Sequence, residues 1–195
     1  MDYDRAIDTI ISFKSQFEIL DIEPKKKEKV PKKLVSELGE FYVIRQLMQR
    51  FNDVEPKGGQ APYDIRVGDK RIEVKTSLLK NDGLYDKQIQ FWGWTVQRAG
   101  LKDKNKFDYL IGVALNQTWN KPAFYIFTFE EAFTKNTDIK IKRYPSIRKK
   151  IHIFQNERDL SIAKKASPLE VTDLECNIIS NPFDYADQWN KIMDL

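Results

Sequence analysis

A pair of short charged segments meets at Gly68-Asp69, and their residue types could build a metal site. Apolar and charged residues alternate on both sides of this pair, as in two β-strands with one buried face. A glycine-first pair between alternating runs is typical of a two-residue hairpin turn of type I′ or II′. The register set by such a turn places Asp64 directly opposite Glu73.

Alternation puts Asp64, Glu73 and Lys75 on one face of this hairpin. Directly paired residues have Cβ atoms roughly 4.5–5.5 Å apart, so the two carboxylates should repel each other by about 0.2–1 kcal/mol. A divalent cation would turn that repulsion into attraction, and oxygen ligands of this kind suit Mg²⁺ or Mn²⁺. Lys75 would lie within reach of a nucleophilic water or a scissile phosphate. The opposite face is expected to be core: Tyr63, Ile65, Val67, Ile72 and Val74.

An amphipathic helix is expected ahead of the hairpin, from Pro31 or soon after it to about Phe51. Gly39 in its interior costs about 1 kcal/mol relative to alanine, which a close approach to a sheet or a ligand would explain. The neighbouring Glu40 falls on the shoulder of the buried face. The main apolar stripe is predicted to consist of Leu34, Leu38, Phe41, Met48 and Phe51.

These residues resemble the PD-(D/E)XK nuclease superfamily, whose motif is an acidic residue, a turn, then Asp or Glu, any residue, and Lys. Asp64, Glu73 and Lys75 match the three positions, although Tyr63 interrupts the family's Pro-Asp pair. The resemblance implies a metal-dependent phosphodiesterase that acts mostly on DNA. It also implies a further carboxylate from the preceding helix, for which Glu40 is the candidate and Glu37 the alternative.

The remaining pattern predicts a mixed central β-sheet of about four or five strands flanked by α-helices, which is the restriction-endonuclease-like fold class of the resemblance. Residues 107–115 form a nearly continuous apolar run, as expected of a covered central strand, and residues 124–127 read as its neighbour. Thr128 and Glu131 have the spacing of a capping box. Trp92 and Trp94 lie in an aromatic strand and belong either to the core or to a base-stacking surface.

A basic segment at residues 140–165 holds nine lysines and arginines against two acidic residues. It is the best candidate for sequence-independent contacts with DNA phosphates. A loop at residues 24–33 with six lysines is either a second phosphate contact or a solvated loop. His152 is expected to be a strand residue rather than a metal ligand. The predicted DNA-contacting residues are Lys142, Arg143, Arg148, Lys149 and Lys150.

Length and composition favour one domain, residues 1–195, with a core at 34–130 and a basic extension at 140–195. The sequence shows no signal segment and no apolar run of the roughly 20 residues that span a bilayer, so a soluble, cytoplasmic protein without membrane contact is expected. The net charge of +4 is too small by itself to indicate a nucleic-acid partner.

The sequence therefore predicts a Mg²⁺-dependent DNA endonuclease, with Asp64, Glu73 and Glu40 on the metal and Lys75 at the water or phosphate. A type II restriction-like enzyme is favoured, and cutting both strands with one site per chain would require a homodimer. The alternatives are a repair or Holliday-junction-resolving nuclease, a non-catalytic nucleic-acid-binding protein, or simply a solvated hairpin in a charge-rich chain.

Overall fold

The computed structural model describes residues 1–19, 32–58, 61–81, 89–97, 106–133, 140–141, 148–165, 175–178 and 181–192. Two helices, α1 (Tyr3–Ile19) and α2 (Lys32–Met48), precede the strands. The described strands form two five-stranded sheets. The first sheet has the order β1 (Val54–Pro56), β2 (Ile65–Val67), β3 (Lys70–Leu78), β6 (Tyr109–Leu115) and β7 (Ala123–Thr128). The second has the order β4 (Lys80–Asn81), β5 (Gln90–Gln97), β9 (Arg148–Phe154), β10 (Glu175–Ile178) and β8 (Lys140–Ile141).

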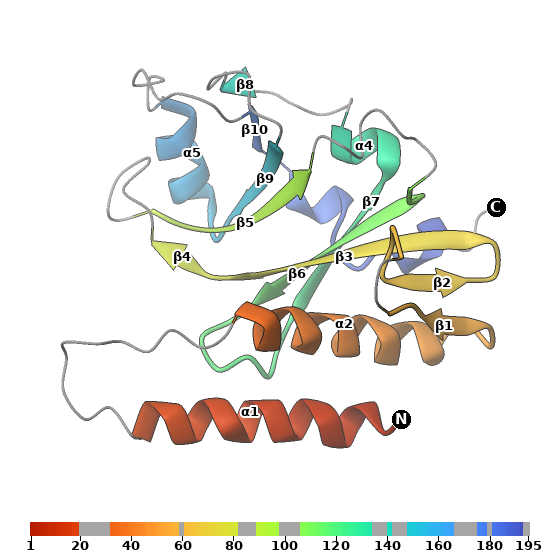
Figure 1. Ribbon diagram of the computed structural model, residues 1–195. Helices are drawn as coiled ribbons and strands as arrows, with labels where there is room; N and C mark the ends of the chain where they lie inside the picture. Colours follow the sequence, from red (N-terminus) through yellow and green to blue (C-terminus); the bar gives the residue numbers. More distant parts are fainter. Residues whose placement is uncertain are drawn as a thin grey trace.

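The elements stack in layers, with α1 outside α2, then the first sheet and then the second (Figure 1). Within the first sheet β3 and β6 run parallel and the other pairs antiparallel, so the expected mixed α/β sheet of five strands flanked by helices is present. The second sheet was not predicted. It covers the face away from α2, beside the short helix α4 (Phe129–Phe133), so that face is not closed by helices alone. The remaining described elements are α5 (Glu157–Lys165) and the 3₁₀ turns η1 (Pro182–Asp184) and η2 (Trp189–Ile192).

The hairpin of β2 and β3 has the register that its turn predicts over the three paired positions, from Val67↔Lys70 to Ile65↔Ile72. Gly68 has a φ of +57°, whereas Asp69 does not have a positive φ, which fits the type II′ alternative. The core face is confirmed for four of its five residues, since Ile65, Val67, Ile72 and Val74 all join the cluster under α2. Tyr63 is the exception, because it packs against the cluster between the two sheets.

Helix α2 packs directly on β3 at Gly39. A Cβ atom there would lie 1.8 Å from Thr76 Oγ1, so only glycine allows this distance between helix and strand. The close approach to a sheet that the interior glycine suggested is therefore confirmed. The same contact leaves Thr76 Oγ1 buried without a hydrogen-bond partner.

The predicted apolar stripe of α2 was wrong in part. Leu38 is buried, but Met48 is 47% exposed and Leu34, Phe41 and Phe51 are only partly buried. Because α2 lies between α1 and the first sheet, it buries residues on more than one side, and its apolar positions do not form one stripe. The buried residues are Val35, Leu38, Gly39, Tyr42, Val43, Ile44 and Leu47.

Several local predictions are confirmed. Every residue of β6 is buried, as its apolar run predicts. The capping box at α4 forms in both directions, since Thr128 N donates to Glu131 Oε2 at 2.9 Å and Glu131 N donates to Thr128 Oγ1 at 3.1 Å. His152 is a buried residue of β9 whose ring lies 4.5 Å from that of Phe91.

The two tryptophans of β5 contribute to the core between the sheets. Trp94 is buried, and its indole N–H donates to Val113 O at 3.2 Å. The Trp92 N–H donates to Leu115 O at 3.0 Å, and its ring is partly buried. These bonds fasten the second sheet to β6 of the first.

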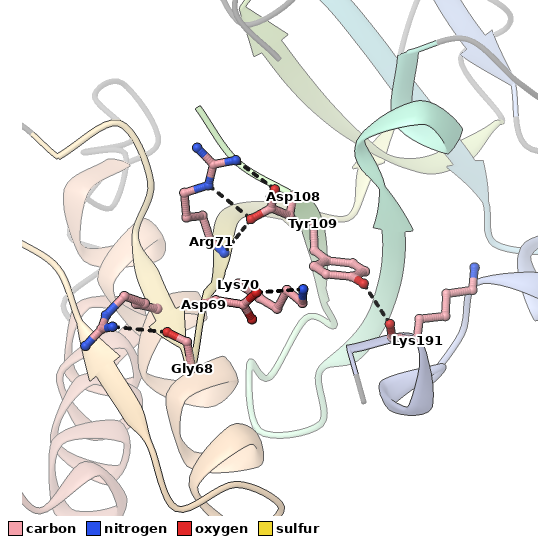
Figure 2. A network of polar contacts seen from close by, with 8 residues as sticks. Gly68, Asp69, Lys70, Arg71, Asp108, Tyr109 and Lys191 are labelled. Carbon is pink, nitrogen blue, oxygen red and sulfur yellow. Dashed lines mark hydrogen bonds and ion pairs between the residues drawn. The ribbon is translucent and has the colours of Figure 1, made fainter. Parts of the chain in front are cut away.

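An ion pair fastens the start of β3 to the start of β6. The Arg71 guanidinium donates to both carboxylate oxygens of Asp108, at 3.0 and 2.7 Å, and the Arg71 backbone N–H adds a third bond at 2.8 Å (Figure 2). Burial alone would raise the pKa of Asp108, but the hydrogen bonds and charge of Arg71 outweigh it and hold that pKa below its usual value. Nearby, Tyr109 Oη donates to Lys191 O at 2.8 Å, which ties β6 to η2.

Among the described residues, no helix combines the length and the apolar character needed to cross a lipid bilayer.

The Gly39 contact generates a stability prediction. Gly39→Ala should lower the free energy of unfolding by about 1–3 kcal/mol, because the clash with Thr76 outweighs the gain in helix propensity. For a chain of this size, each kcal/mol lowers the melting temperature by roughly 2–4 °C in a thermal melt. Gly58→Ala is the matched control, since nothing lies within 4 Å of its added Cβ. The cost should shrink in a Thr76→Ala background; an unchanged or raised melting temperature for Gly39→Ala alone would contradict the packing.

Candidate active site

The structure brings together the four residues that the sequence singled out as catalytic. Glu40 comes from α2, Asp64 directly precedes β2, and Glu73 and Lys75 lie on β3. The charges of Asp64 and Lys75 both act on the pKa of Glu40, and the same two charges act on the pKa of Glu73. Two carboxylates thus share one acidic and one basic neighbour, which defines a single charged site at the edge of the hairpin.

Asp64 does not pair with Glu73 across the hairpin, and this part of the prediction was wrong. The ladder ends at Ile65↔Ile72, and the Asp64 N–H donates to Ile72 O at 3.0 Å, one residue short of Glu73. The chain bends here, and Asp64 Oδ2 instead accepts the backbone N–H of Val74 at 2.7 Å. The carboxylate is therefore held against the backbone of β3, where it still raises the pKa of Glu73.

Glu73 and Lys75 form an ion pair along one face of β3. The Lys75 ammonium donates to Glu73 Oε1 and also to Val74 O, the latter at 3.3 Å. The Glu73 side chain is only 18% exposed and that of Lys75 33%, so the pair is largely shielded from water. Burial raises the pKa of Glu73, with Asp64 adding to the rise, while the charge of Lys75 opposes both.

Glu40 is the most strongly perturbed carboxyl group of the site. Burial, with the negative charge of Asp64 as the next cause, raises its pKa to about 7. A hydrogen bond from Ser36 Oγ at 3.4 Å and the charge of Lys75 act in the opposite direction. Glu37, the alternative helix carboxylate, has a side chain 40% exposed and pairs with Lys33 at 3.7 Å. Of the two, Glu40 is the one coupled to both Asp64 and Lys75.

A cavity of about 280 Å³ lies beside Glu40 and Asp64. Lys57, Gly58 and Ala61 of the loop before the hairpin form one wall, and the Lys57 N–H donates to Asp64 O at 2.7 Å. Sequence reasoning missed Ser36 and Tyr63 at this cavity. Ser36 lies one helical turn before Glu40, a spacing that could have signalled the contact. The cavity is lined by Lys33, Ser36, Glu37, Glu40, Lys57, Gly58, Ala61, Tyr63 and Asp64.

The carboxylates have the right chemistry for a hard divalent cation but do not form a ready-made cage. Within the described residues, no group of three or more His, Cys, Asp or Glu side chains is arranged to hold a metal ion. One oxygen of Asp64 takes the Val74 N–H and one of Glu73 takes the Lys75 ammonium. Binding of Mg²⁺ would therefore require Glu73 or Glu40 to turn toward Asp64, with charge relief as the driving force.

The predicted DNA-contacting residues are only partly described. Arg148, Lys149 and Lys150 open β9, where they pair with Gln97, Val96 and Thr95 of β5. Lys142 and Arg143 lie outside the described residues, as do most of the lysines of the 24–33 loop.

No protein-family model matches this chain, and no curated protein matches it. A carboxyl group with a pKa near 7 can exchange a proton with water at neutral pH, and a shielded lysine can stabilise a developing negative charge. The arrangement suits hydrolysis of an anionic ester.

The pKa of Glu40 generates a pH prediction. Its folded value of about 7 lies above the ordinary value of 4.5, so the folded state holds the proton more tightly and stability from this group falls as pH rises from about 4.5 to 7. Glu40→Gln should therefore leave stability nearly unchanged at pH 4 and increase it by up to about 2 kcal/mol at pH 8, a figure reduced for partial exposure.

Denaturant unfolding at pH 4 and pH 8 measures this difference. Glu37→Gln, one turn earlier on the same helix, controls for loss of a helix carboxylate. Equal effects of the two variants at pH 8, or a less stable Glu40→Gln protein, would show that ionised Glu40 is not destabilised by its burial and by the charge of Asp64.

Proposed function

We propose that this protein is a Mg²⁺-dependent endonuclease that hydrolyses DNA phosphodiester bonds. The observation that carries the proposal is the electrostatic coupling of Glu40, Asp64, Glu73 and Lys75, which come from a helix and a hairpin. Two of the four, Glu40 and Asp64, line a cavity. The mixed sheet with α2 packed on β3 supports extending the proposal to a restriction-endonuclease-like fold. These are the residues and elements that the resemblance to PD-(D/E)XK nucleases implies.

Each residue has a role that its surroundings allow. Asp64, fixed by the Val74 N–H, would hold the metal together with Glu73 and Glu40. Bound Mg²⁺ would supply a Lewis acid and lower the pKa of an attacking water. Lys75 leaves Glu73 and donates to the phosphate oxygens, where charge develops in the transition state. Glu40 would complete the ligand shell; its pKa of about 7 belongs to the metal-free site, and a bound cation would favour its ionised form.

The surroundings of the cavity suit a phosphate backbone. Lys33 and Lys57 line it together with Glu40 and Asp64, so cationic side chains stand beside the carboxylates. The basic segment that includes Arg148, Lys149 and Lys150 adds sequence-independent attraction for DNA. A type II restriction-like enzyme that cuts both strands as a homodimer in the cytoplasm remains the favoured form, and a repair or Holliday-junction nuclease is the alternative of the same class.

Cleavage of plasmid DNA tests the proposal. Wild-type protein with Mg²⁺ should cut or nick the plasmid and EDTA should abolish the reaction. Asp64→Asn, Glu73→Gln and Lys75→Ala should each lower the rate by about a hundredfold or more while DNA binding persists, because they remove transition-state interactions.

Matched controls lie on the same hairpin. Asp69→Asn removes an exposed turn carboxylate and Lys70→Ala removes the lysine paired with it, and neither should change the rate. A rate lost equally in Asp69→Asn and Asp64→Asn would point to general damage to the hairpin. Absence of cleavage by the wild type on linear, supercoiled and branched DNA would overturn the enzyme assignment.

The basic segment generates a separate prediction. Replacing Arg148, Lys149 and Lys150 with alanine should weaken DNA binding and flatten its salt dependence, since each lost phosphate contact lowers the slope of log K against log salt by about 0.9. Binding isotherms at several salt concentrations measure this slope. Arg5→Ala, on the outer helix α1, is the control, and an unchanged slope for the triple variant would move the DNA surface elsewhere.

A non-catalytic nucleic-acid-binding protein is the second candidate. The observation that favours it is that one oxygen of Asp64 and one of Glu73 already engage protein groups. Salt-sensitive DNA binding without cleavage, together with a melting temperature that Mg²⁺ does not raise, would support this reading.

A further inference from the structure

A second cavity lies near the other end of β3 and has a different chemical character. Its volume is about 510 Å³, within the range of small-molecule sites. It is separate from the carboxylate site, since the two cavities share no lining residue. Its lining includes Leu79, Gln90, Trp92, Asn116, Lys121 and Gln155.

The walls of this cavity are held in place by the backbone around them. On one side the Gln155 N–H donates to Gln90 O at 3.1 Å, so the two glutamines lie side by side. The Gln90 N–H in turn donates to Asp159 Oδ2 at 3.1 Å, and Asp159 is a buried residue of α5. Two amide side chains are thereby presented from a fixed backbone.

Another wall is the turn after β6, which the buried Trp119 fastens to the core. Trp119 has a φ of +64°, an unfavourable conformation for a bulky residue. Its carbonyl accepts a hydrogen bond from Tyr42 Oη at 2.8 Å, and its N–H donates to Asn116 O at 3.3 Å. Strained backbone of this kind persists where the surroundings hold it, and it is concentrated at binding sites.

Trp92 provides an aromatic surface in the cavity. Its N–H is used by Leu115 O, so what it can offer a ligand is the ring. The ring is partly exposed, whereas the chain's other three tryptophans, Trp94, Trp119 and Trp189, are buried. An aromatic ring beside amide side chains is the combination that stacks a nucleobase and hydrogen-bonds its edge.

The charge of the residues that line the cavity limits the class of ligand further. Among the described residues that line the cavity, Lys121 is the one charged residue and none is a carboxylate. A neutral sugar would not need this cation, whereas a phosphate group would pair with it. The geometry points to a binding site for a nucleotide unit, with the base stacked on Trp92, its edge on Gln90 and Gln155, and its phosphate at Lys121. This assignment does not rest on the proposed nuclease activity.

Fluorescence titration of the full chain in EDTA tests the site, because Trp92 is the partly exposed tryptophan. The probes are nucleoside 5′-monophosphates, the matching nucleosides, inorganic phosphate, glucose and a short single-stranded oligonucleotide. Monophosphates should give saturable quenching and nucleosides weaker binding. Tighter binding of the oligonucleotide would identify a nucleic-acid strand as the source, and equal or tighter binding of the monophosphate a free nucleotide; either supports the site.

Two variants with matched controls locate the binding. Gln155→Ala should weaken nucleotide affinity by about two- to tenfold and Lys121→Ala by about two- to fivefold, the latter without affecting nucleosides. Both side chains are exposed and neither has a hydrogen-bond partner in the described part of the chain, so the fold should survive. Gln49→Ala and Lys106→Ala, which do not line the cavity, should bind as the wild type does.

Three results would overturn the assignment. The first is an absence of saturable quenching by any nucleotide, and the second is quenching by glucose or phosphate alone that equals that of the monophosphates. The third is nucleotide binding that Gln155→Ala and Lys121→Ala leave unchanged.

Discussion

The contact between Gly39 and Thr76 is the constraint on which the candidate site depends. With no side chain between them, α2 lies against β3 at a distance that any Cβ would forbid. The contact has a cost, since it leaves a buried hydroxyl oxygen unpaired, and burying such a group without a partner costs about 1–3 kcal/mol. Because α2 lies so close to β3 at Gly39, the next residue, Glu40, is held near the edge of β3.

Glu40 can lie beside β3 because β2 is short. That strand pairs over three residues only, and Asp64 leaves the ladder to bind the Val74 N–H through its carboxylate. The Asp64 carboxylate thus accepts the Val74 N–H, a backbone donor that a longer β2 strand would have paired. Beyond Ile72, β3 has no paired residue of β2 beside it. Three carboxylates can then approach one lysine. Their repulsion is reduced because Glu73 pairs with Lys75 and the pKa of Glu40 rises.

What the sequence predicted well was encoded locally. Gly68-Asp69 determines the hairpin register, and Thr128 with Glu131 determines the start of α4, because each signal acts over a few residues. Glu40 could be chosen because its helical phase puts it beside the buried Ile44 and Leu47. The bend at Asp64 could not be predicted, since strict alternation contains no signal for a residue that leaves the ladder.

The second sheet was missed for a different reason. Its central pair joins Trp94 to Ile151, residues far apart in the chain, and neither strand alone shows which partner it takes. The aromatic run of β5 left a core position and a base-stacking surface as alternatives, and Trp94 lies in the core between the sheets. Long-range pairing is where single-sequence reasoning fails, because its energy depends on contacts that only the folded chain creates.

The carboxylate site and the amide-lined cavity lie at different positions along β3, which is paired with β6 over most of its length, so the distance between them is fixed. Leu79 follows Lys75 by four residues, which is about 13 Å along an extended strand. A mononucleotide is too short to reach both sites, and occupancy of the amide-lined cavity leaves the carboxylates accessible. Only a polynucleotide could engage the two together, and the β3–β6 ladder would then set the number of nucleotides between them.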